Sequence, residues 1–448
     1  MKNLFCKNTA PIFCYKDQMY MQVEYAASTV TNLIVLSHRP EYDPTMKRLQ
    51  AFKFELIPNG EQQQSMSRFA GCCRFVYNRA LSIQKENHEA GNSYIGYVKM
   101  AAQLVDWKKN FDTCWLNDAP SQALQHALKH LETAYKNFFA RRTDFPRFAK
   151  RGSRDSFHYP QGFKLDEANH RIFLPKLGWI RYRNSRAVVG EVRNMTLSSR
   201  HGKWFVAIQT QHEVEAPLPD STTAVGVDVG IARFATFSDG SHVEPLNSFK
   251  HKQSQLTKHQ RRMCKKTKFS SNWKKAKAKV QKVHGQIANA RQDFLHKLTT
   301  TISKNHALVC IEDLQVRNMS KSSKGNREQP GKKVKQKSGL NRSILDQGWG
   351  EFRRQLDYKL GWNGGVLLAV PPQNTSITCP CCAHVSKDNR KTQSQFACVA
   401  CDYENNADVV GAINILERGH RLLACGEPMR LGRSAKQEPT EVIQALAA

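Results

Sequence analysis

The chain contains little negative charge and no long apolar segment. Its 448 residues include 38 Asp and Glu against 68 Lys and Arg, which gives a formal net charge of +30. A membrane-spanning helix needs roughly 18 consecutive apolar residues, and no such run occurs. A positive excess of this size repels itself unless a polyanion neutralises it, so the composition favours nucleic acid over a membrane surface as the partner.

The first 45 residues lack the features of a signal peptide. They carry Lys2, Lys7 and Lys16 and contain no long apolar block followed by a small-residue cleavage site. They also show no clear periodicity. We therefore expect residues 1–45 to be an N-terminal extension and the folded protein to begin at Met46.

Five of the thirteen cysteines lie between Cys379 and Cys401. This clustering suits a reduced protein with a metal site better than a disulfide framework. The pairs Cys379/Cys382 and Cys398/Cys401 have the C-x2-C spacing of two knuckles, which together supply the tetrahedral sulfur set that zinc accepts. Because thiolates fill all four positions, we predict structural rather than catalytic zinc, with Cys381 as a surplus neighbour.

Changes of periodicity divide the rest of the chain. Residues 48–57 alternate between apolar and charged side chains, as in a half-buried strand. Residues 61–150 are rich in helix formers, and Leu124, Leu128, Leu131, Tyr135 and Phe138 form an amphipathic stripe. Residues 152–219 predict short strands that build a small β-barrel or sandwich together with the first strand. Apolar strands and helices then alternate, which is typical of an α/β domain.

Three acids stand out because they lie in or beside apolar segments. Asp228 lies within GVDVG, Glu312 directly follows the apolar residues VCI of VCIED, and Asp408 opens the helix in NNADVVGAINIL. Alone, each is typical of a turn, a cap or a first helical turn. Together, three converging carboxylates can hold two divalent ions and hydrolyse a phosphodiester. We expect Mg²⁺, with Mn²⁺ as the alternative, and Asp313 should point to the opposite face of its strand from Glu312.

Residues 250–282 contain thirteen Lys and Arg and no Asp or Glu. A solvated helix face is the simplest explanation of such a run, but the complete lack of acids favours contact with nucleic acid. The predicted contact residues are Arg261, Arg262, Lys274, Lys275, Lys277 and Lys279.

The order of these features resembles the TnpB family. Its members are RNA-guided DNA nucleases of bacterial insertion sequences, related to the compact type V CRISPR nucleases. The resemblance covers most of the chain from Met46 to Leu416. It is carried by AFKFELIPNGEQ, GCCRFVYNRAL, FLPKLGWIRYR, GVDVGIARFATFSDG, HGQIANARQDFLHKL, VCIEDL, NTSITCPCCAHVSKDNR and QFACVACDYENNADVVGAINIL.

The resemblance implies a multi-domain α/β protein with an RNase H-like (RuvC) nuclease domain, in which Asp228, Glu312 and Asp408 are the metal ligands. It also implies a wedge β-barrel that is interrupted by a helical recognition domain. We expect the wedge barrel at 46–60 and 151–219, the recognition domain at 61–150, the nuclease core at 220–372, a zinc-ribbon insert at 373–404, the last nuclease helix at 405–420 and a flexible tail at 421–448.

The implied function is that of an RNA-guided, Mg²⁺-dependent DNA endonuclease encoded by a transposon. Its partners would be a guide RNA derived from the transposon end and double-stranded target DNA with a short flanking motif. We expect a monomer with RNA in the bacterial cytoplasm, associated with the nucleoid and not with a membrane.

The chain departs from the family pattern at a few positions. Ala383 and Asp402 replace glycines that often follow the knuckle cysteines, and Val410-Gly411 replaces an Asn-Ala pair after the last acid. Val410 is expected to remove a polar group near the metal end. It is the one feature that favours a guide-RNA-dependent repressor or transposition regulator without efficient cleavage. A transposase would also need three acids, but no separate helix-turn-helix is apparent.

Overall fold

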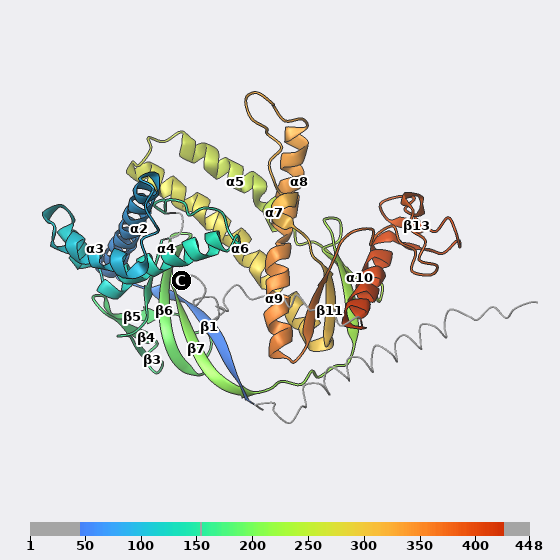
Figure 1. Ribbon diagram of the computed structural model, residues 1–448, viewed down its shortest axis with the longest axis horizontal. Helices are drawn as coiled ribbons and strands as arrows, with labels where there is room; N and C mark the ends of the chain where they lie inside the picture. The colour runs from blue at the N-terminus through green and yellow to red at the C-terminus, as the bar shows by residue number, and fades with distance from the viewer. Residues whose placement is uncertain (1–44, 153–154, 425–448) are drawn as a thin grey trace, which may run out of the picture. The chain divides into compact units, whose positions relative to one another are not determined.

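The computed structural model describes residues 45–152 and 155–424, which divide into two compact units (Figure 1). The expected N-terminal extension up to residue 44 and positions 425–448 of the expected tail lie outside the described residues. Within the described part of the chain, no helix has both the length and the apolar character that crossing a membrane requires.

A seven-stranded antiparallel sheet organises the first unit, residues 45–215 and 256–285. The strand order is β2-β6-β7-β1-β5-β4-β3. These strands are β1 (Thr45–Ile57), β2 (Ser156–Tyr159), β3 (Lys164–Asp166), β4 (Arg171–Leu174), β5 (Gly178–Tyr182), β6 (Glu191–Arg200) and β7 (Lys203–Glu215). Since β1 pairs with both β7 and β5, the prediction that the first strand joins the later ones is confirmed.

Helices fill the sequence between β1 and β2. They are α2 (Gly60–Glu89), α3 (Tyr97–Lys109), the 3₁₀ helix η1 (Phe111–Asp118) and α4 (Ser121–Phe139). The side chain of Asn59 begins α2 by accepting from Gln62 N at 2.8 Å, and Gln62 Oε1 accepts from Asn59 N at 3.1 Å. The predicted stripe of α4 is confirmed, because Leu124, Leu128, Leu131 and Tyr135 are buried and Phe138 is partly buried against the same core.

A five-stranded sheet is the centre of the second unit, residues 216–255 and 286–424. Its order is β10-β9-β8-β11-β12, and β8, β11 and β12 run parallel. The strands are β8 (Ala224–Val229), β9 (Ala235–Phe237), β10 (His242–Val243), β11 (Leu308–Glu312) and β12 (Val366–Val370). The three parallel strands are almost wholly apolar because helices cover both of their faces.

Successive residues of β11 face different helices. Val309 and Ile311 pack in a core that includes Phe352 and Leu356, whereas Leu308 and Cys310 pack with Ile415. The helices of this unit are the first part of α5 (Ser248–Cys264), the last part of α6 (Ser271–Asn305), α7 (Val316–Met319), α8 (Val334–Gln347), α9 (Trp349–Trp362) and α10 (Ala407–Ala424). Helix α10 therefore continues four residues beyond its expected end at residue 420. Shorter elements η2 (Lys387–Asn389), β13 (Gln395–Ala397) and β14 (Glu404–Asn406) lie between β12 and α10.

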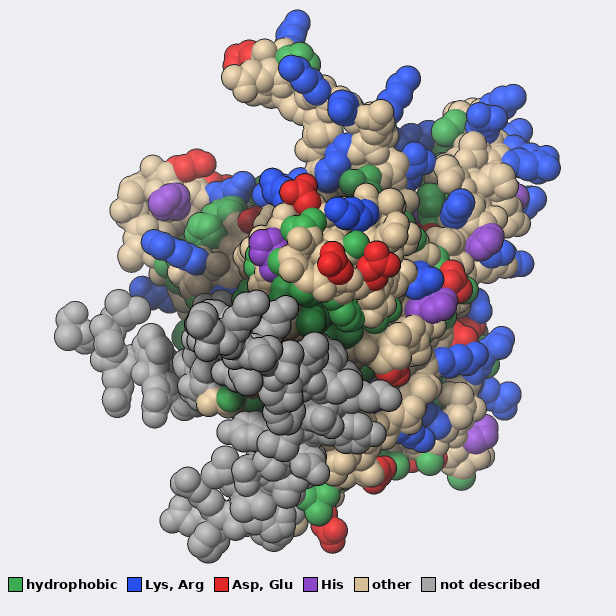
Figure 2. Space-filling view, turned by 90° about the vertical axis from the view of Figure 1, so that its right-hand side faces the viewer, with side chains coloured by type: hydrophobic (Ala, Val, Ile, Leu, Met, Phe, Trp, Pro, Cys, Tyr) green, Lys and Arg blue, Asp and Glu red, His purple; other side chains and the backbone are tan. Residues whose placement is uncertain are grey.

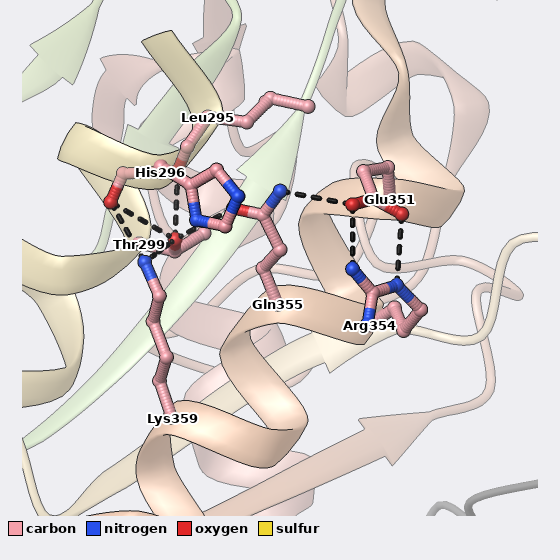
Figure 3. Close-up of polar contacts among 7 residues, drawn as sticks. All are labelled: Leu295, His296, Thr299, Glu351, Arg354, Gln355 and Lys359. Carbon is pink, nitrogen blue, oxygen red and sulfur yellow. Dashed lines mark hydrogen bonds and ion pairs between the residues drawn. The ribbon is translucent and has the colours of Figure 1, made fainter. Parts of the chain in front are cut away.

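A polar network fastens α9 to α6 (Figure 3). Lys359 Nζ donates to Thr299 Oγ1 at 2.8 Å and to His296 O at 2.7 Å, and the Thr299 hydroxyl lies 3.1 Å from Gln355 Oε1. Partial burial lowers the pKa of Lys359 to about 8. The lysine sits among oxygen acceptors, so this network fixes the helical layer that supports one face of the sheet.

Candidate functional site

Parallel pairing of β8 and β11 brings two of the three acids together. Ile311 lies opposite Val227 in the register, so Glu312 and Asp228 come next along the two strands, near their carboxyl ends. Side chains alternate along a strand. Asp228 therefore shares its face with Gly226, and Glu312 shares its face with Cys310, which packs with α10. Both carboxylates face the side of the sheet that α10 covers.

Helix α10 approaches this face closely because glycines leave room for it. A Cβ atom on Gly226 would collide with Ala412 O of the helix, and one on Gly419 would collide with Cys310 Sγ of the sheet. Asp408 lies in the first turn of α10, where Asn406 Oδ1 accepts from its backbone N–H at 3.0 Å. Close packing thus brings a third carboxylate from α10 to the ends of two strands.

The site is electrostatically unfavourable without cations. Burial raises the pKa of Asp228 to about 7, with further increases from Glu312 and then Asp408, while Arg390 acts in the opposite direction. Burial also raises the pKa of Glu312, against the lowering effects of a hydrogen bond from Thr375 and of Arg418. A carboxyl whose pKa is raised by burial and by two neighbouring acids, as that of Asp228 is, is typical of a cation site.

Arg390 is a member of the site that the sequence did not reveal. Its Nη2 lies 3.6 Å from Asp408 Oδ1 and donates to Gln393 O at 2.8 Å. It belongs to the cysteine-rich segment, eighteen residues before Asp408, in a run that also contains Lys387 and Lys391. Without the fold, nothing distinguishes it from those two neighbours.

Asp313 lies apart from the other acids. Its carboxylate forms an ion pair with Arg353 of α9, whereas Glu312 Oε1 accepts from Thr375 Oγ1 at 2.6 Å. The two adjacent acids therefore have partners in different elements, which agrees with the alternation expected at the end of β11.

The three acids fit a hard divalent cation by their chemistry. Carboxylate oxygens are the ligands that Mg²⁺ prefers, and Asp228 is buried among like charges that such an ion would neutralise. In the described residues, the cysteines discussed next are the only group of three or more ligand side chains whose atoms all lie within 4.8 Å of one another. The ligand atoms of the three acids are therefore not all within that distance of one another.

Four cysteines form the compact cluster: Cys379, Cys382, Cys398 and Cys401. The Sγ atoms of Cys379 and Cys401 are 3.6 Å apart, as are those of Cys382 and Cys398. Tetrahedral coordination with Zn–S bonds of about 2.3 Å requires sulfurs about 3.8 Å apart, so the cluster fits zinc. The set of four cysteines that the spacing predicted is confirmed, and Cys381 is not part of it.

Both knuckles turn through a left-handed residue. Ala383 has φ 60° and Asp402 has φ 56°. These are the positions where the family often has glycine, and glycine adopts this conformation without strain. The turns are therefore retained, and the two substitutions place a Cβ atom in a conformation that disfavours it.

Val410 lies in the first turn of α10, as Asp408 does, but its side chain packs in a different environment from the acids. It is fully buried in a core with Cys379, Phe396, Cys398 and Ala407. Gly411, the next residue, is the one beside Asp228. Successive helical residues point about 100° apart, so the replaced position packs against the cysteine cluster and not against the acids.

The six predicted nucleic-acid-binding residues lie in the first unit, which comprises residues 45–215 and 256–285. Arg261 and Arg262 end α5, while Lys274, Lys275, Lys277 and Lys279 begin α6, and all six side chains are exposed. Lys277 Nζ lies 5.2 Å from the ring centre of Trp273, which in turn contacts the exposed Phe269. Exposed cations interleaved with aromatic rings can contact both phosphates and bases.

Comparisons with known proteins define the class of the chain first. A family model described as "Probable transposase" matches residues 207–323, and one described as "Cas12f1-like, TNB domain" matches residues 349–415. A third, described as "Helix-turn-helix domain", matches residues 46–93, which here form β1 and the single long helix α2. The chain is thus an insertion-sequence protein of the OrfB class.

Relatives that align with most of this chain then identify the family. An Escherichia coli (strain K12) protein named "Putative RNA-guided DNA endonuclease InsQ" is 60% identical over 402 residues, which cover 90% of this chain and 100% of the relative. A Streptomyces pristinaespiralis protein named "Putative RNA-guided DNA endonuclease" is 35% identical over 404 residues, which cover 87% of this chain and 96% of the relative. The chain belongs to the TnpB family, the OrfB type of IS605.

Solved structures are more distant. The mini-RNA-guided endonuclease CRISPR-Cas phi3 is 11% identical with a TM-score of 0.40, over 91% of this chain and 97% of that chain. A Cas12f1 complex with guide RNA and target DNA is 14% identical with a TM-score of 0.31, over 83% and 100%.

Proposed function

We propose that this chain is an RNA-guided, Mg²⁺-dependent DNA endonuclease in which Asp228, Glu312 and Asp408 hold the catalytic metal. The observation that carries the proposal is the convergence of these acids from β8, β11 and α10, with the pKa of Asp228 raised to about 7 by burial and by the other two. A family relative that aligns with 90% of this chain over its own whole length is named "Putative RNA-guided DNA endonuclease InsQ". The partners are a guide RNA derived from the transposon end and double-stranded DNA with a short flanking motif.

The protein side chains would orient the reacting groups. Mg²⁺ (or Mn²⁺), when bound, supplies an activated water and stabilises the leaving oxygen. The three carboxylates hold that charge at the ends of the strands, where the sheet is rigid. Arg390, which lies 3.6 Å from Asp408, is placed to contact a non-bridging phosphate oxygen and to neutralise charge that develops there.

The domain organisation follows the same proposal. The five-stranded sheet and α10 correspond to an RNase H-like (RuvC) core at 220–372 and 405–420, with a zinc ribbon at 373–404 that holds structural Zn²⁺. The seven-stranded sheet corresponds to the wedge barrel at 46–60 and 151–219, with the helical recognition domain at 61–150. We propose a cytoplasmic, nucleoid-associated monomer with RNA.

Charge supports nucleic acid as the partner. On the face shown in Figure 2, Lys and Arg side chains are numerous and widely spread, whereas Asp and Glu side chains are few. The six exposed cations of α5 and α6 lie in a segment without any acid, and no acidic side chain of the described residues forms an ion pair with them. A polyanion is the partner that such a segment can neutralise.

Neither alternative function has gained support. The non-cutting regulator depended on Val410, which packs in the cysteine-cluster core instead of facing the acids. A transposase agrees with the description of one matching family model, but the residues matched by the helix-turn-helix model form one strand and one helix.

Cleavage of DNA by the protein purified with its own RNA tests the proposal. A plasmid carrying the guide-matched sequence beside a randomised flank should be cut in Mg²⁺, and Asp228→Asn, Glu312→Gln and Asp408→Asn should each abolish cutting while retaining target binding. Asp313→Asn is the matched control and should cut normally, because Asp313 pairs with Arg353 instead. Target binding without cutting by the wild type would favour the regulator, and joining of DNA ends would favour the transposase.

A further inference from the structure

A hydrogen bond from Thr375, in the segment after β12, fixes the carboxylate of Glu312. Thr375 Oγ1 donates to Glu312 Oε1 at 2.6 Å, and a second acceptor, Pro372 O, lies farther away at 3.2 Å. A hydroxyl has one hydrogen, and a charged acceptor at the shorter distance takes it. Thr375 is 3% exposed, so water does not compete for this bond.

Asn414 of α10 holds Thr375 in place. Its Nδ2 donates to Thr375 O at 2.7 Å and to Thr378 O at 2.8 Å, and the side chain is buried. Arg418, one turn farther along the helix, donates to Pro371 O at 2.8 Å. Asn414 lies on the same helix as Asp408, so α10 carries one acid and, through Thr375, restrains another.

The cysteine cluster restrains the same segment from its other end. Asn389 Nδ2 donates to Ile377 O at 3.0 Å, and Asn389 Oδ1 accepts from Val399 N at 3.0 Å. Asn389 is fully buried, and Cys379 follows directly after Thr378. Residues 375–379 are therefore a short segment, held on both sides, that begins at Thr375, the hydrogen-bond partner of Glu312, and ends at the first of the four cysteines.

We propose that Thr375 and Asn414 are positioning residues of the three-acid site, which couple the orientation of Glu312 to that of Asp408 and to the cysteine cluster. This inference rests on the proposed function, because it concerns the same acids. The bond to Oε1 leaves Oε2 and one lone pair of Oε1 for a cation. Rotation of the carboxylate is restricted before a cation binds, which favours binding.

Binding of Mn²⁺ to the full-length, zinc-loaded protein without RNA tests the role of the hydroxyl. The relevant binding, measured by electron paramagnetic resonance, is the part that Asp228→Asn removes. Thr375→Val should weaken it by about tenfold or more, while Thr375→Ser should stay within about twofold of the wild type. Thr378→Val is the matched control, because Thr378 Oγ1 donates to Asn374 O at 2.7 Å, away from the acids.

Wild-type affinity in Thr375→Val would overturn the proposed role of the hydroxyl. So would an equal loss in Thr375→Ser, because the cause would then be packing. A loss of site-specific Mn²⁺ binding confined to Thr375→Val, with thermal stability near that of the wild type, supports positioning rather than a general structural role.

Hydrogen exchange tests, without any catalytic metal, the clamp that the Asn414 side chain forms on Thr375 and Thr378. The amides of Ile377 and Thr378 donate to Asn374 O at 3.2 and 3.1 Å. Asn414→Ala should speed their exchange while leaving the amides of β8 protected. Unchanged protection would overturn the clamp. If exchange changes as expected but Asp228→Asn removes no Mn²⁺ binding, then the proposed metal site fails and the clamp stands.

Discussion

Gly411 lies directly against Asp228: a Cβ atom at position 411 would come within 3.2 Å of Asp228 Oδ2. Few real Cβ contacts are this close, so a methyl group at position 411 requires a shift of a few tenths of an ångström, and a larger side chain must displace the carboxylate or the helix. The small size of residue 411 is therefore part of the geometry of the acid site, and it gives the first prediction.

Gly411→Leu should lower the cleavage rate by roughly tenfold to a hundredfold, because a side chain larger than the methyl group that the family often has here must displace the Asp228 carboxylate, and misplacing one metal ligand disturbs the site. Leucine is a better helix former than glycine by up to about 1 kcal/mol, which offsets part of the cost of the contact in stability. Gly361→Leu is the matched control, because a Cβ atom on this α9 glycine meets nothing within 4 Å. It should cut normally, and equal cutting by both variants would contradict the prediction.

The raised pKa of Asp228 predicts how stability depends on pH in the absence of Mg²⁺. An Asp that titrates near 4 in the unfolded chain and at about 7 in the folded protein stabilises the fold below pH 4, and this contribution is lost as the pH rises to 7. Asp228→Asn removes the titration. The stability of the variant relative to the wild type should therefore rise by roughly 3 kcal/mol between pH 5 and pH 8.

Denaturant unfolding of both proteins at several pH values, with zinc retained, measures this difference. Burial raises the pKa of Glu312 as well, so some dependence in the same direction should remain in the variant. Parallel curves for the two proteins would show that Asp228 is not the source of the effect.

Charge reversal in α6 should weaken binding to nucleic acid of any sequence. Replacing Lys274, Lys275, Lys277 and Lys279 by Glu removes cations that are exposed. Each lost phosphate contact should reduce the slope of log K against log salt by about one. Titration of guide RNA and of duplex DNA at several salt concentrations gives the slope, and unchanged affinity throughout would mean that these lysines form a solvated face.

Ala383→Gly should stabilise the cysteine cluster. A non-glycine residue in the left-handed region destabilises the folded state by about 1–2 kcal/mol. The greater conformational entropy of glycine in the unfolded chain offsets about 0.5–1 kcal/mol of the stability gained by the substitution. A net gain of roughly 0.5–1 kcal/mol should slow the release of zinc to a chromogenic chelator. Asp402→Gly should gain less, because Asp tolerates this conformation better than Ala.

Ala397→Gly, in the ribbon strand β13, is the control and should speed the release of zinc. If Ala383→Gly also speeds the release, then the left-handed turn is not the strained part of the knuckle.

Features that depend on short spacings could be predicted from the sequence. The two C-x2-C pairs identified the four cysteines, because residues three positions apart on one knuckle must lie close together whatever the rest of the chain does. Period-two alternation identified β1, and the three- and four-residue spacing identified α4. The sequence indicates the three acids for a similar local reason, since each lies in or beside an apolar segment that a sheet or a close-packed helix must bury.

The tertiary structure alone decided which neighbours of these residues belong to the site. Arg390 lies beside Asp408, while Lys387 and Lys391 have the same local character. Val410 turned out to pack against the cysteine cluster, because the direction of α10 on the sheet decides which face of the helix meets the acids. Thr375 reaches Glu312 because the link before Cys379 is held by Asn414 and Asn389. Irregular segments carry no periodic pattern, and the contacts of their side chains follow from the elements that hold them.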